Sequence, residues 1–191
     1  KRNEQRLMRN HSHDYDSTLS SLVISGKTPL VGKVTISGAK NAALPLLFAT
    51  ILSNNKVTIN NVPNLSDVHT TVAILKELGA KVEAGNNKII VNSSYINSYY
   101  ANANLVSSMR ASVLMIGPLL AKFGIVQIAT PGGCTIGRRP IDIHLKCLEQ
   151  LGARVESKTS CIELTAKELV GTTIEVEKAS VGATENLIMA A

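Results

Sequence analysis

The sequence predicts an α/β fold built from repeated units of strand, helix, strand, helix and two strands. Apolar residues recur at helical spacing in some segments and alternate in shorter ones, so both kinds of element are expected. The clearest sign of repetition is the match between residues 78–83 (LGAKVE) and 151–156 (LGARVE). Similar segments at a fixed distance indicate copies of one structural unit.

The first unit is expected at about 31–95, after a polar segment, 1–21, that is typical of a mobile N-terminal extension. Ser66 and Asp67 suit the first turn of a helix, and Gly79 suits its C-terminal cap. The residues GNN at 85–87 suit a hairpin turn. The elements expected are a strand at 31–37, a helix at 42–52, a strand at 57–60, a helix at 66–78, and strands at 80–83 and 88–91.

The second unit is expected at about 105–170, and a third begins at 173. An apolar helix near the last residue would lack the strands that cover it. We therefore expect a partial domain at 22–191, truncated in its third repeat. The elements expected are a helix at 109–122, a strand at 125–129, a helix at 141–151, strands at 154–157, 161–165 and 173–176, and a helix at 180–191.

Composition limits the class of protein. Apolar residues make up 45% of the 191 residues and charged residues 18%, which suits a soluble chain with a real core. The longest apolar stretches, 44–52 and 113–121, are about half the roughly 20 residues that a bilayer span needs. No apolar signal segment follows the basic residues 1–9. A cytoplasmic protein without a membrane partner is expected.

The spacing of the cysteines and the net charge limit the classes of ligand that the protein is expected to bind. Cys134, Cys147 and Cys161 form no C-x-x-C pair, which argues against both a disulfide framework and a zinc site, so no metal is expected. The net charge of +6 favours anions. Aromatic residues make up only 3%, and no RNA-binding signature is present. Small phosphorylated ligands therefore fit the charge better than nucleic acid does.

A Gly-rich loop at 131–140 (PGGCTIGRRP) holds the first cysteine, Cys134. Nearby positive charge and a helix N-terminus both lower the pKa of a thiol, and glycines let a ligand approach the backbone. Cys134 is therefore a candidate reactive or proton-donating thiol, and a buried cysteine in a tight turn is the alternative. For Cys147, in a helix, and Cys161, in a strand, burial is the favoured interpretation.

Basic residues at three places could bind an anion. Arg138 and Arg139 can hold phosphate or carboxylate through paired hydrogen bonds. Arg110 begins an apolar helix, where the helix dipole disfavours a cation, and a surface arginine is the alternative. Lys40 and Asn41 lie where a strand passes into a helix, so an ammonium and free amide groups could converge on an anion, or simply cap the helix.

Other polar residues carry weaker signals. Lys40 does not follow the spacing of a phosphate-binding P-loop. For Asp142 and His144, in the first turn of a helix, capping and surface exposure are favoured over catalysis. His11, His13 and Asp14 resemble a metal cluster only by composition.

Four motifs together carry a family resemblance: TISGAKNAALP at 35–45, MRAS at 109–112, PGGCTIG at 131–137 and SVGATEN at 180–186. They closely resemble those of the UDP-N-acetylglucosamine enolpyruvyl transferases, also called 1-carboxyvinyltransferases, of bacterial peptidoglycan synthesis. The resemblance covers about 22–191, with the motifs in the same order. The sister enzyme of the shikimate pathway has a different opening motif and no cysteine loop of this kind.

The resemblance implies a two-domain protein of the inside-out α/β barrel type, in which each domain has three βαβαββ units. It implies transfer of the enolpyruvyl group of phosphoenolpyruvate to the 3-hydroxyl of UDP-N-acetylglucosamine, with release of phosphate. No metal or organic cofactor is expected. The family takes its general base and several arginines from the second domain, which is absent here, so this chain alone is expected to be inactive.

The resemblance also implies residue roles. Cys134 matches the proton donor, which can form an adduct with phosphoenolpyruvate and be alkylated by fosfomycin. Lys40, Asn41 and Arg139 match residues that bind phosphoenolpyruvate, and Arg110 matches one that positions the UDP-sugar. The remaining matches surround the UDP part: Pro140, Ile141, Asp142, Ile143 and His144 in one segment, and Lys178, Ala179, Ser180 and Val181 in another.

Two other functions are considered. A thiol-dependent redox or acyl-transfer enzyme could use Cys134, but no histidine partner or resolving cysteine stands at an obvious spacing. A UDP-sugar binding fragment without catalysis is the second, and comparing turnover with binding separates it from an enzyme.

Overall fold

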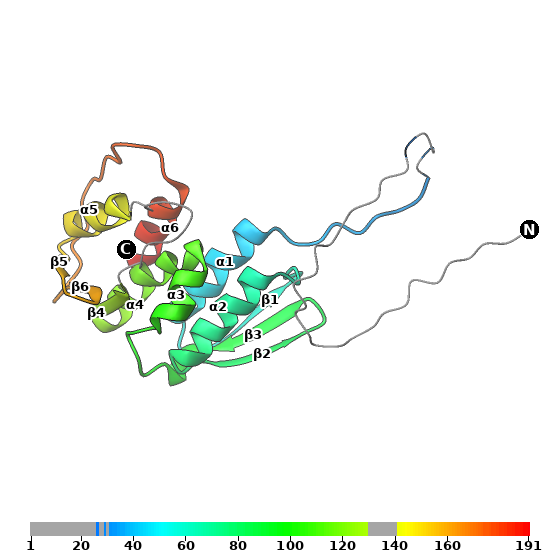
Figure 1. The fold of residues 1–191 in the computed structure, drawn as a ribbon, viewed down its shortest axis with the longest axis horizontal. Helices are drawn as coiled ribbons and strands as arrows, with labels where there is room; N and C mark the ends of the chain where they lie inside the picture. Colours follow the sequence, from blue (N-terminus) through cyan, green and yellow to red (C-terminus); the bar gives the residue numbers. More distant parts are fainter. Residues whose placement is uncertain (1–25, 27–28, 30, 130–140) are drawn as a thin grey trace, which may run out of the picture. The chain divides into compact units, whose positions relative to one another are not determined.

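The structure is a computed structural model that describes residues 26, 29, 31–129 and 141–191. The chain divides into two compact units, Lys1–Thr35 and Ile36–Ala191. The extension expected at 1–21 and the whole of the cysteine loop, 131–140, lie outside the described residues. The helices and strands named below belong to the second unit (Figure 1).

The first repeat forms a three-stranded antiparallel sheet covered by two helices (Figure 1). Its strands lie in the order β1-β3-β2, so β3, the last of the three along the chain, is the central strand. Asn86 and Asn87 join β2 to β3 with φ values of 50° and 57°, as a two-residue type I′ turn requires. The elements are α1 (Lys40–Ala49), a 3-10 turn (Thr50–Leu52), β1 (Lys56–Asn60), α2 (Ser66–Glu77), β2 (Lys81–Gly85) and β3 (Lys88–Asn92).

The second repeat has the same sheet order, β4-β6-β5. Gln127 of β4 also forms an isolated parallel bridge with Tyr100, which precedes α3. The helix α3, which the sequence analysis missed, begins after Asn102, whose side chain accepts a hydrogen bond from the amide of Asn104. The elements are α3 (Ala103–Ser108), a 3-10 helix (Arg110–Met115), α4 (Ile116–Phe123), β4 (Ile125–Ala129), α5 (Asp142–Gln150), β5 (Arg154–Ser157) and β6 (Cys161–Thr165), followed by α6 (Val181–Ala190).

The repeated residues Leu-Gly-Ala end α2 and α5 in the same way. In the first copy the amide of Ala80 donates to the carbonyl of Leu75, and the amide of Gly79 donates to that of Lys76. This pair of bonds defines a Schellman motif, in which a glycine takes a left-handed conformation. The second copy repeats both bonds around Gly152, and φ is +108° at Gly79 and +97° at Gly152.

Replacing Gly79 with alanine is expected to destabilise the protein more than replacing Gly152. In both variants the left-handed backbone costs about 1–2 kcal/mol. At Gly79 the new Cβ would also lie 2.7 Å from the carbonyl oxygen of Tyr95 and 2.8 Å from Oδ1 of Asn97. At Gly152 the nearest atom is the carbonyl oxygen of Glu168, at 3.5 Å. Urea denaturation of both variants measures the difference, and equal losses would contradict the role of close packing at Gly79.

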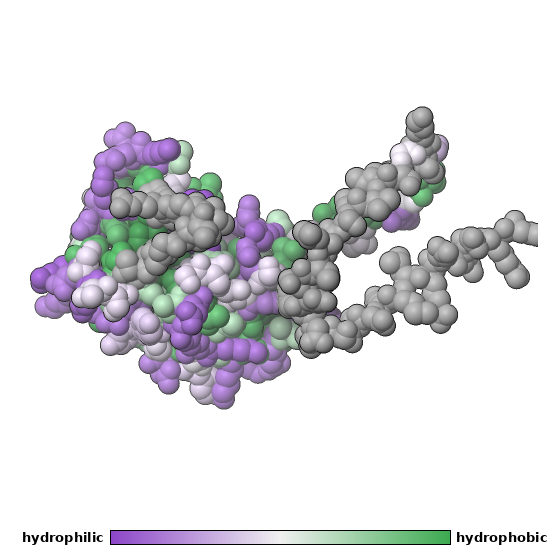
Figure 2. Space-filling view, viewed as in Figure 1, coloured by the Kyte–Doolittle hydropathy of each residue, from purple (hydrophilic) through white to green (hydrophobic). Residues whose placement is uncertain are grey.

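One continuous apolar core joins the two repeats within the second unit. Leu47 and Phe48 of α1, Leu75 of α2, Leu119 of α4 and Leu148 of α5 are completely buried in it. On the face drawn in Figure 2, hydrophilic side chains surround smaller hydrophobic patches. No helix in the described part of the chain is long and apolar enough to cross a membrane.

Two expected strands are wrong. Residues 31–37 and 173–176 take part in none of the strand pairings found among the described residues. Val31 and Val34 are 97% and 85% exposed, so their alternation with polar residues marks no buried face. Ile174 packs half-buried against the core from an extended segment. Alternation therefore signalled an extended backbone, but a strand also needs a hydrogen-bonding partner.

The helix expected at 109–122 is present but has two parts. It is a 3-10 helix as far as Met115 and an α-helix from Ile116. Pro118 has no amide hydrogen, so the α-helical bond to the carbonyl of Leu114 cannot form. The tighter 3-10 turn is therefore favoured just before the proline.

Candidate active site

A cavity of about 560 Å³ lies where the starts of α1 and α2, the 3-10 helix Arg110–Met115, α5 and the start of α6 meet. Its lining mixes charged and apolar side chains, as ligand cavities of this size commonly do. The structure thus brings together residues that are distant in the sequence. The predicted site residues that line it are Lys40, Asn41, Arg110, His144, Ala179, Ser180 and Val181.

Other predicted site residues do not line this cavity. Asp142 and Lys178 are exposed, and Ile141 packs half-buried against the core. Because α5 begins at Asp142, its residues turn away in succession, and only His144 reaches the cavity. The described residues that lie outside the lining are Ile141, Asp142, Ile143 and Lys178, whereas Cys134, Arg139 and Pro140 lie outside the described residues.

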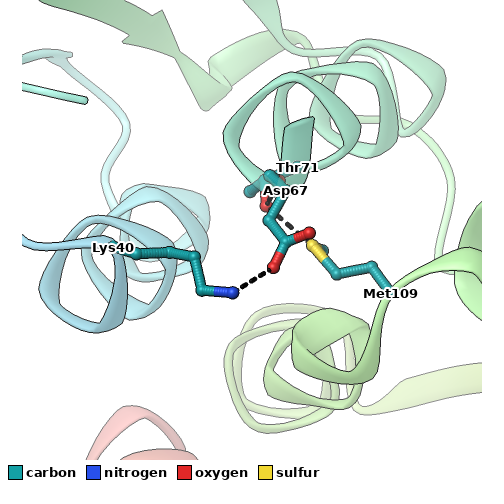
Figure 3. Close-up of polar contacts among 4 residues, drawn as sticks. All are labelled: Lys40, Asp67, Thr71 and Met109. Atoms are coloured by element: carbon teal, nitrogen blue, oxygen red, sulfur yellow. Dashed lines mark hydrogen bonds and ion pairs between the residues drawn. The ribbon is translucent and has the colours of Figure 1, made fainter. Parts of the chain in front are cut away.

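Lys40 is the first residue of α1, and its ammonium group forms an ion pair with Asp67 in the first turn of α2. Nζ of Lys40 lies 2.8 Å from Oδ2 of Asp67 (Figure 3). The two side chains are 48% and 33% exposed, so the pair contributes at most about 1 kcal/mol. No side chain caps the start of α1 at Ala39. An incoming anion therefore competes with one partly exposed carboxylate for the ammonium, and it can also accept from the first amides of the helix.

A buried contact links this ion pair to the element that carries Arg110. Thr71 is completely buried, and its hydroxyl donates to the carbonyl oxygen of Asp67 at 2.9 Å. The same hydroxyl lies 3.6 Å from Sδ of Met109, the residue before Arg110 (Figure 3). Thr71 thus connects the backbone at Asp67 with Met109, the neighbour of Arg110 in the sequence.

The charges of the described lining balance. Two basic residues, Lys40 and Arg110, stand with two acidic residues, Asp67 and Glu185. Burial raises the pKa of the Glu185 carboxyl above its ordinary value. The sequence analysis placed Asp67 only in a helix turn and gave Glu185 no role of its own. Glu185 follows Val181 by four residues on α6, and this helical spacing is the signal that could have found it.

His144, in the cavity lining, and Asn186, behind it, form a buried polar network. His144 is 8% exposed and Asn186 is completely buried. Nδ2 of Asn186 lies 2.9 Å from Nδ1 of His144 and 3.0 Å from the carbonyl oxygen of Val113. The amide of Gly117 donates to Oδ1 of Asn186 at 2.9 Å. Burial lowers the pKa of His144, and the positive charge of Arg110 lowers it further.

Acidification is expected to remove part of the protein's stability through His144. In the unfolded chain this imidazole takes up a proton near its ordinary pKa of about 6.5, whereas the folded pKa is lower. The stability linked to the neutral His144 is therefore fully present above the pKa of the unfolded chain, and it is lost as the pH falls towards the pKa of the folded protein. Thermal unfolding between about pH 7.5 and pH 5 tests this, with His144→Gln as the variant that cannot titrate. A wild type that loses no more stability than His144→Gln would contradict it.

Comparison with known proteins identifies the family. The family model of EPSP synthase (3-phosphoshikimate 1-carboxyvinyltransferase) matches residues 24–191. The chain belongs to the EPSP synthase family. The enolpyruvyl transferase NikO from Streptomyces tendae matches 84% of this chain and 38% of its own, with a TM-score of 0.72 and 19% identity. An EPSP synthase from Acinetobacter baumannii matches 83% of this chain and 37% of its own, with a TM-score of 0.62 and 16% identity. The expected α/β fold of the enolpyruvyl transferase type is confirmed, as part of such a domain.

Curated relatives within the EPSP synthase family are much closer in sequence. A Vesicomyosocius okutanii protein named UDP-N-acetylglucosamine 1-carboxyvinyltransferase is 48% identical over 171 residues, which is 89% of this chain. A Campylobacter jejuni protein of the same name is 47% identical over 173 residues, or 91% of this chain. The resemblance inferred from the four motifs is therefore confirmed. The chain spans 41% of the length of each of these relatives.

Proposed function

We propose that this chain is part of an enzyme that transfers the enolpyruvyl group of phosphoenolpyruvate to the 3-hydroxyl of UDP-N-acetylglucosamine. The observation that carries the proposal is the identity of 47% and 48% to relatives with that name over about nine-tenths of the chain. The description of the family model suggests 3-phosphoshikimate as a second candidate acceptor. The Acinetobacter EPSP synthases are only 15% and 16% identical, which favours the UDP-sugar.

The cavity supports binding of phosphoenolpyruvate at the start of α1. Lys40 can turn from Asp67 to a phosphate or carboxylate, because their exposed ion pair is weak. The first amides of α1 have no side-chain cap, and the positive end of its helix dipole favours an anion. Asn41 lines the same wall, and Arg139 would join from the loop outside the described residues.

The opposite wall suits the UDP-sugar. Arg110 is exposed at the mouth of the cavity and can pair with a phosphate. Ser180 caps α6 by accepting a hydrogen bond from the amide of Ala183, so the residues before it reach the cavity at the positive end of a helix. His144, in the same lining, adds an imidazole.

The chemistry is an addition followed by an elimination. The general base takes the proton of the 3-hydroxyl as the oxygen bonds to C2 of phosphoenolpyruvate, and Cys134 donates a proton to the methylene carbon. As the C2–O bond to phosphate breaks, the tetrahedral intermediate loses a proton from its new methyl group, which restores the Cys134 thiol, and the proton held by the base passes to the leaving phosphate. The products are the enolpyruvyl ether and inorganic phosphate, so atoms and charges balance. Lys40 and Arg139 stabilise the phosphate as its charge increases.

This assignment places the protein in the cytoplasm, at the first committed step of peptidoglycan synthesis, and so in cell wall formation, cell shape and cell division. It also makes the protein a fosfomycin target through Cys134. The general base is assigned to the part of the relatives that this chain does not span. We therefore expect the 191-residue chain to bind the UDP-sugar without turnover.

A phosphate-release assay tests the proposal directly. The full-length protein is given phosphoenolpyruvate with either UDP-N-acetylglucosamine or 3-phosphoshikimate, with and without fosfomycin. Phosphate release is expected with UDP-N-acetylglucosamine and not with 3-phosphoshikimate, and fosfomycin is expected to block it. Release only with 3-phosphoshikimate would overturn the assigned acceptor. Turnover by the 191-residue chain itself, with its mass verified at 20.3 kDa, would overturn the assignment of the base to the remaining part.

A further inference from the structure

We propose that Asn186 is a positioning residue that fixes the tautomer of His144, so that Nε2 of the imidazole always carries the proton at the cavity. The fixed tautomer follows from contacts inside the second unit and needs no assumption about the ligand. Its use in binding the UDP-sugar rests on the proposed function.

The first step is the orientation of the Asn186 amide, which two backbone groups determine. The amide of Gly117 can only donate, so the atom that it meets at 2.9 Å must be the oxygen of the side chain. The carbonyl of Val113 can only accept, so the atom that it meets at 3.0 Å must be the nitrogen. A flipped amide would oppose donor to donor and acceptor to acceptor in a completely buried site.

The second step is the tautomer of the imidazole. The Asn186 nitrogen carries two hydrogens, one of which goes to Val113. The other points to Nδ1 of His144, 2.9 Å away, and Nδ1 must accept it. A neutral imidazole has one protonated nitrogen, so the proton is on Nε2. Two backbone groups, one in the 3-10 helix and one in α4, thus determine the tautomer of His144 through Asn186.

The third step is the place of Nε2. His144 lines the cavity, and Gly182, also in the lining, faces its Cε1 and Nε2. A side chain at Gly182 would start 3.3 Å from Cε1 and 3.6 Å from Nε2, so the glycine keeps this edge of the ring open. The result is a neutral donor that suits a carbonyl or phosphate oxygen of a nucleotide sugar. The charged groups that share the cavity are Lys40, Asp67, Arg110 and Glu185.

Nitrogen-15 NMR of the histidine rings in the 191-residue chain is the decisive experiment. The signals of His144 are assigned by their loss in His144→Gln. In the wild type at about pH 7.5, Nε2 is expected to be the protonated nitrogen and Nδ1 the unprotonated one. A protonated Nδ1 in the wild type would overturn the proposal without the need for any variant.

Asn186→Asp provides the second arm, because a carboxylate can only accept. Because the carboxylate that then faces Nδ1 is an anion, the proton of His144 is expected to move to Nδ1, or each ring nitrogen is expected to carry a proton. Ile188→Ala, at a position on the same helix that is 72% exposed and outside the cavity lining, is the matched control and should leave the ring unchanged. Retention of the wild-type tautomer in a folded Asn186→Asp protein would overturn the role of Asn186.

Affinity for UDP-N-acetylglucosamine separates this inference from the proposed function. Asn186→Asp is expected to weaken binding by up to about tenfold, the contribution of one hydrogen bond, whereas Ile188→Ala should not change it. If the wild type has the expected tautomer but binds no UDP-sugar, the proposed function fails and the assignment of the tautomer stands. If the wild type binds the UDP-sugar but Nδ1 carries the proton, the assignment of the tautomer fails and the proposed function stands.

Discussion

Replacing Lys40 with alanine is expected to reduce kcat/KM of the full-length enzyme for phosphoenolpyruvate by about 100-fold to 1,000-fold. That is the usual effect of removing one group that stabilises charge developing in a transition state. Lys40 is the one described cation on the α1 wall of the cavity, where the uncapped helix start also favours an anion. Steady-state phosphate release at varied phosphoenolpyruvate measures the loss.

Two further variants make this result specific. Lys76→Ala removes an exposed lysine near the end of α2, outside the cavity lining, and should leave the rate unchanged. Asp67→Asn breaks the ion pair while keeping Lys40, so it should retain far more activity than Lys40→Ala. A fall of less than tenfold for Lys40→Ala would contradict a role for this ammonium in charge stabilisation.

Gly117→Ala is expected to lower the free energy of unfolding by about 2 kcal/mol or more. The added Cβ would lie 2.3 Å from the backbone carbonyl oxygen of Asn186, so α4 and α6 would have to separate. Overpacking of this kind typically costs about 1–3 kcal/mol, and a backbone atom cannot move aside as a flexible side chain can. The higher helix propensity of alanine returns only about 1 kcal/mol.

Chemical denaturation of Gly117→Ala and Gly171→Ala gives the comparison. A Cβ at Gly171 would meet no atom within 4 Å, so this variant should unfold close to the wild type. Equal stability of the two variants would contradict the close approach of α4 and α6. Equal stability would also count against the hydrogen bond from the amide of Gly117 to Asn186, on which the tautomer of His144 depends.

Local signals predicted most of the elements. Apolar spacing placed α2, α5 and α6 to within two residues, and the repeated Leu-Gly-Ala residues predicted two helix ends that have the same hydrogen bonds. These features depend on a few neighbouring residues and on backbone conformations that glycine permits. The family resemblance pointed to Lys40, Arg110, His144 and Ser180, and the structure brings them to one cavity.

Long-range contacts could not be predicted in the same way. The pairing of Lys40 with Asp67 crosses 27 positions, and no local pattern records it. Asn186 was noted only as part of a motif, because its three partners come from other elements. The false strands at 31–37 and 173–176 have the same origin. Alternation describes one segment, whereas strand formation depends on another segment that lies beside it.

Titration of the labelled 191-residue chain with UDP-N-acetylglucosamine, followed by the shifts of its backbone amides, tests the central claim most directly. The second cavity, about 410 Å³ beside the turn at Asn86 and Asn87, serves as the internal control. The expected result is saturable shifts at Lys40, Arg110 and Ser180, with none at that turn. Shifts confined to the turn, or no saturable shift at all, would contradict the assignment of the cavity at α1 and α6 as the UDP-sugar site.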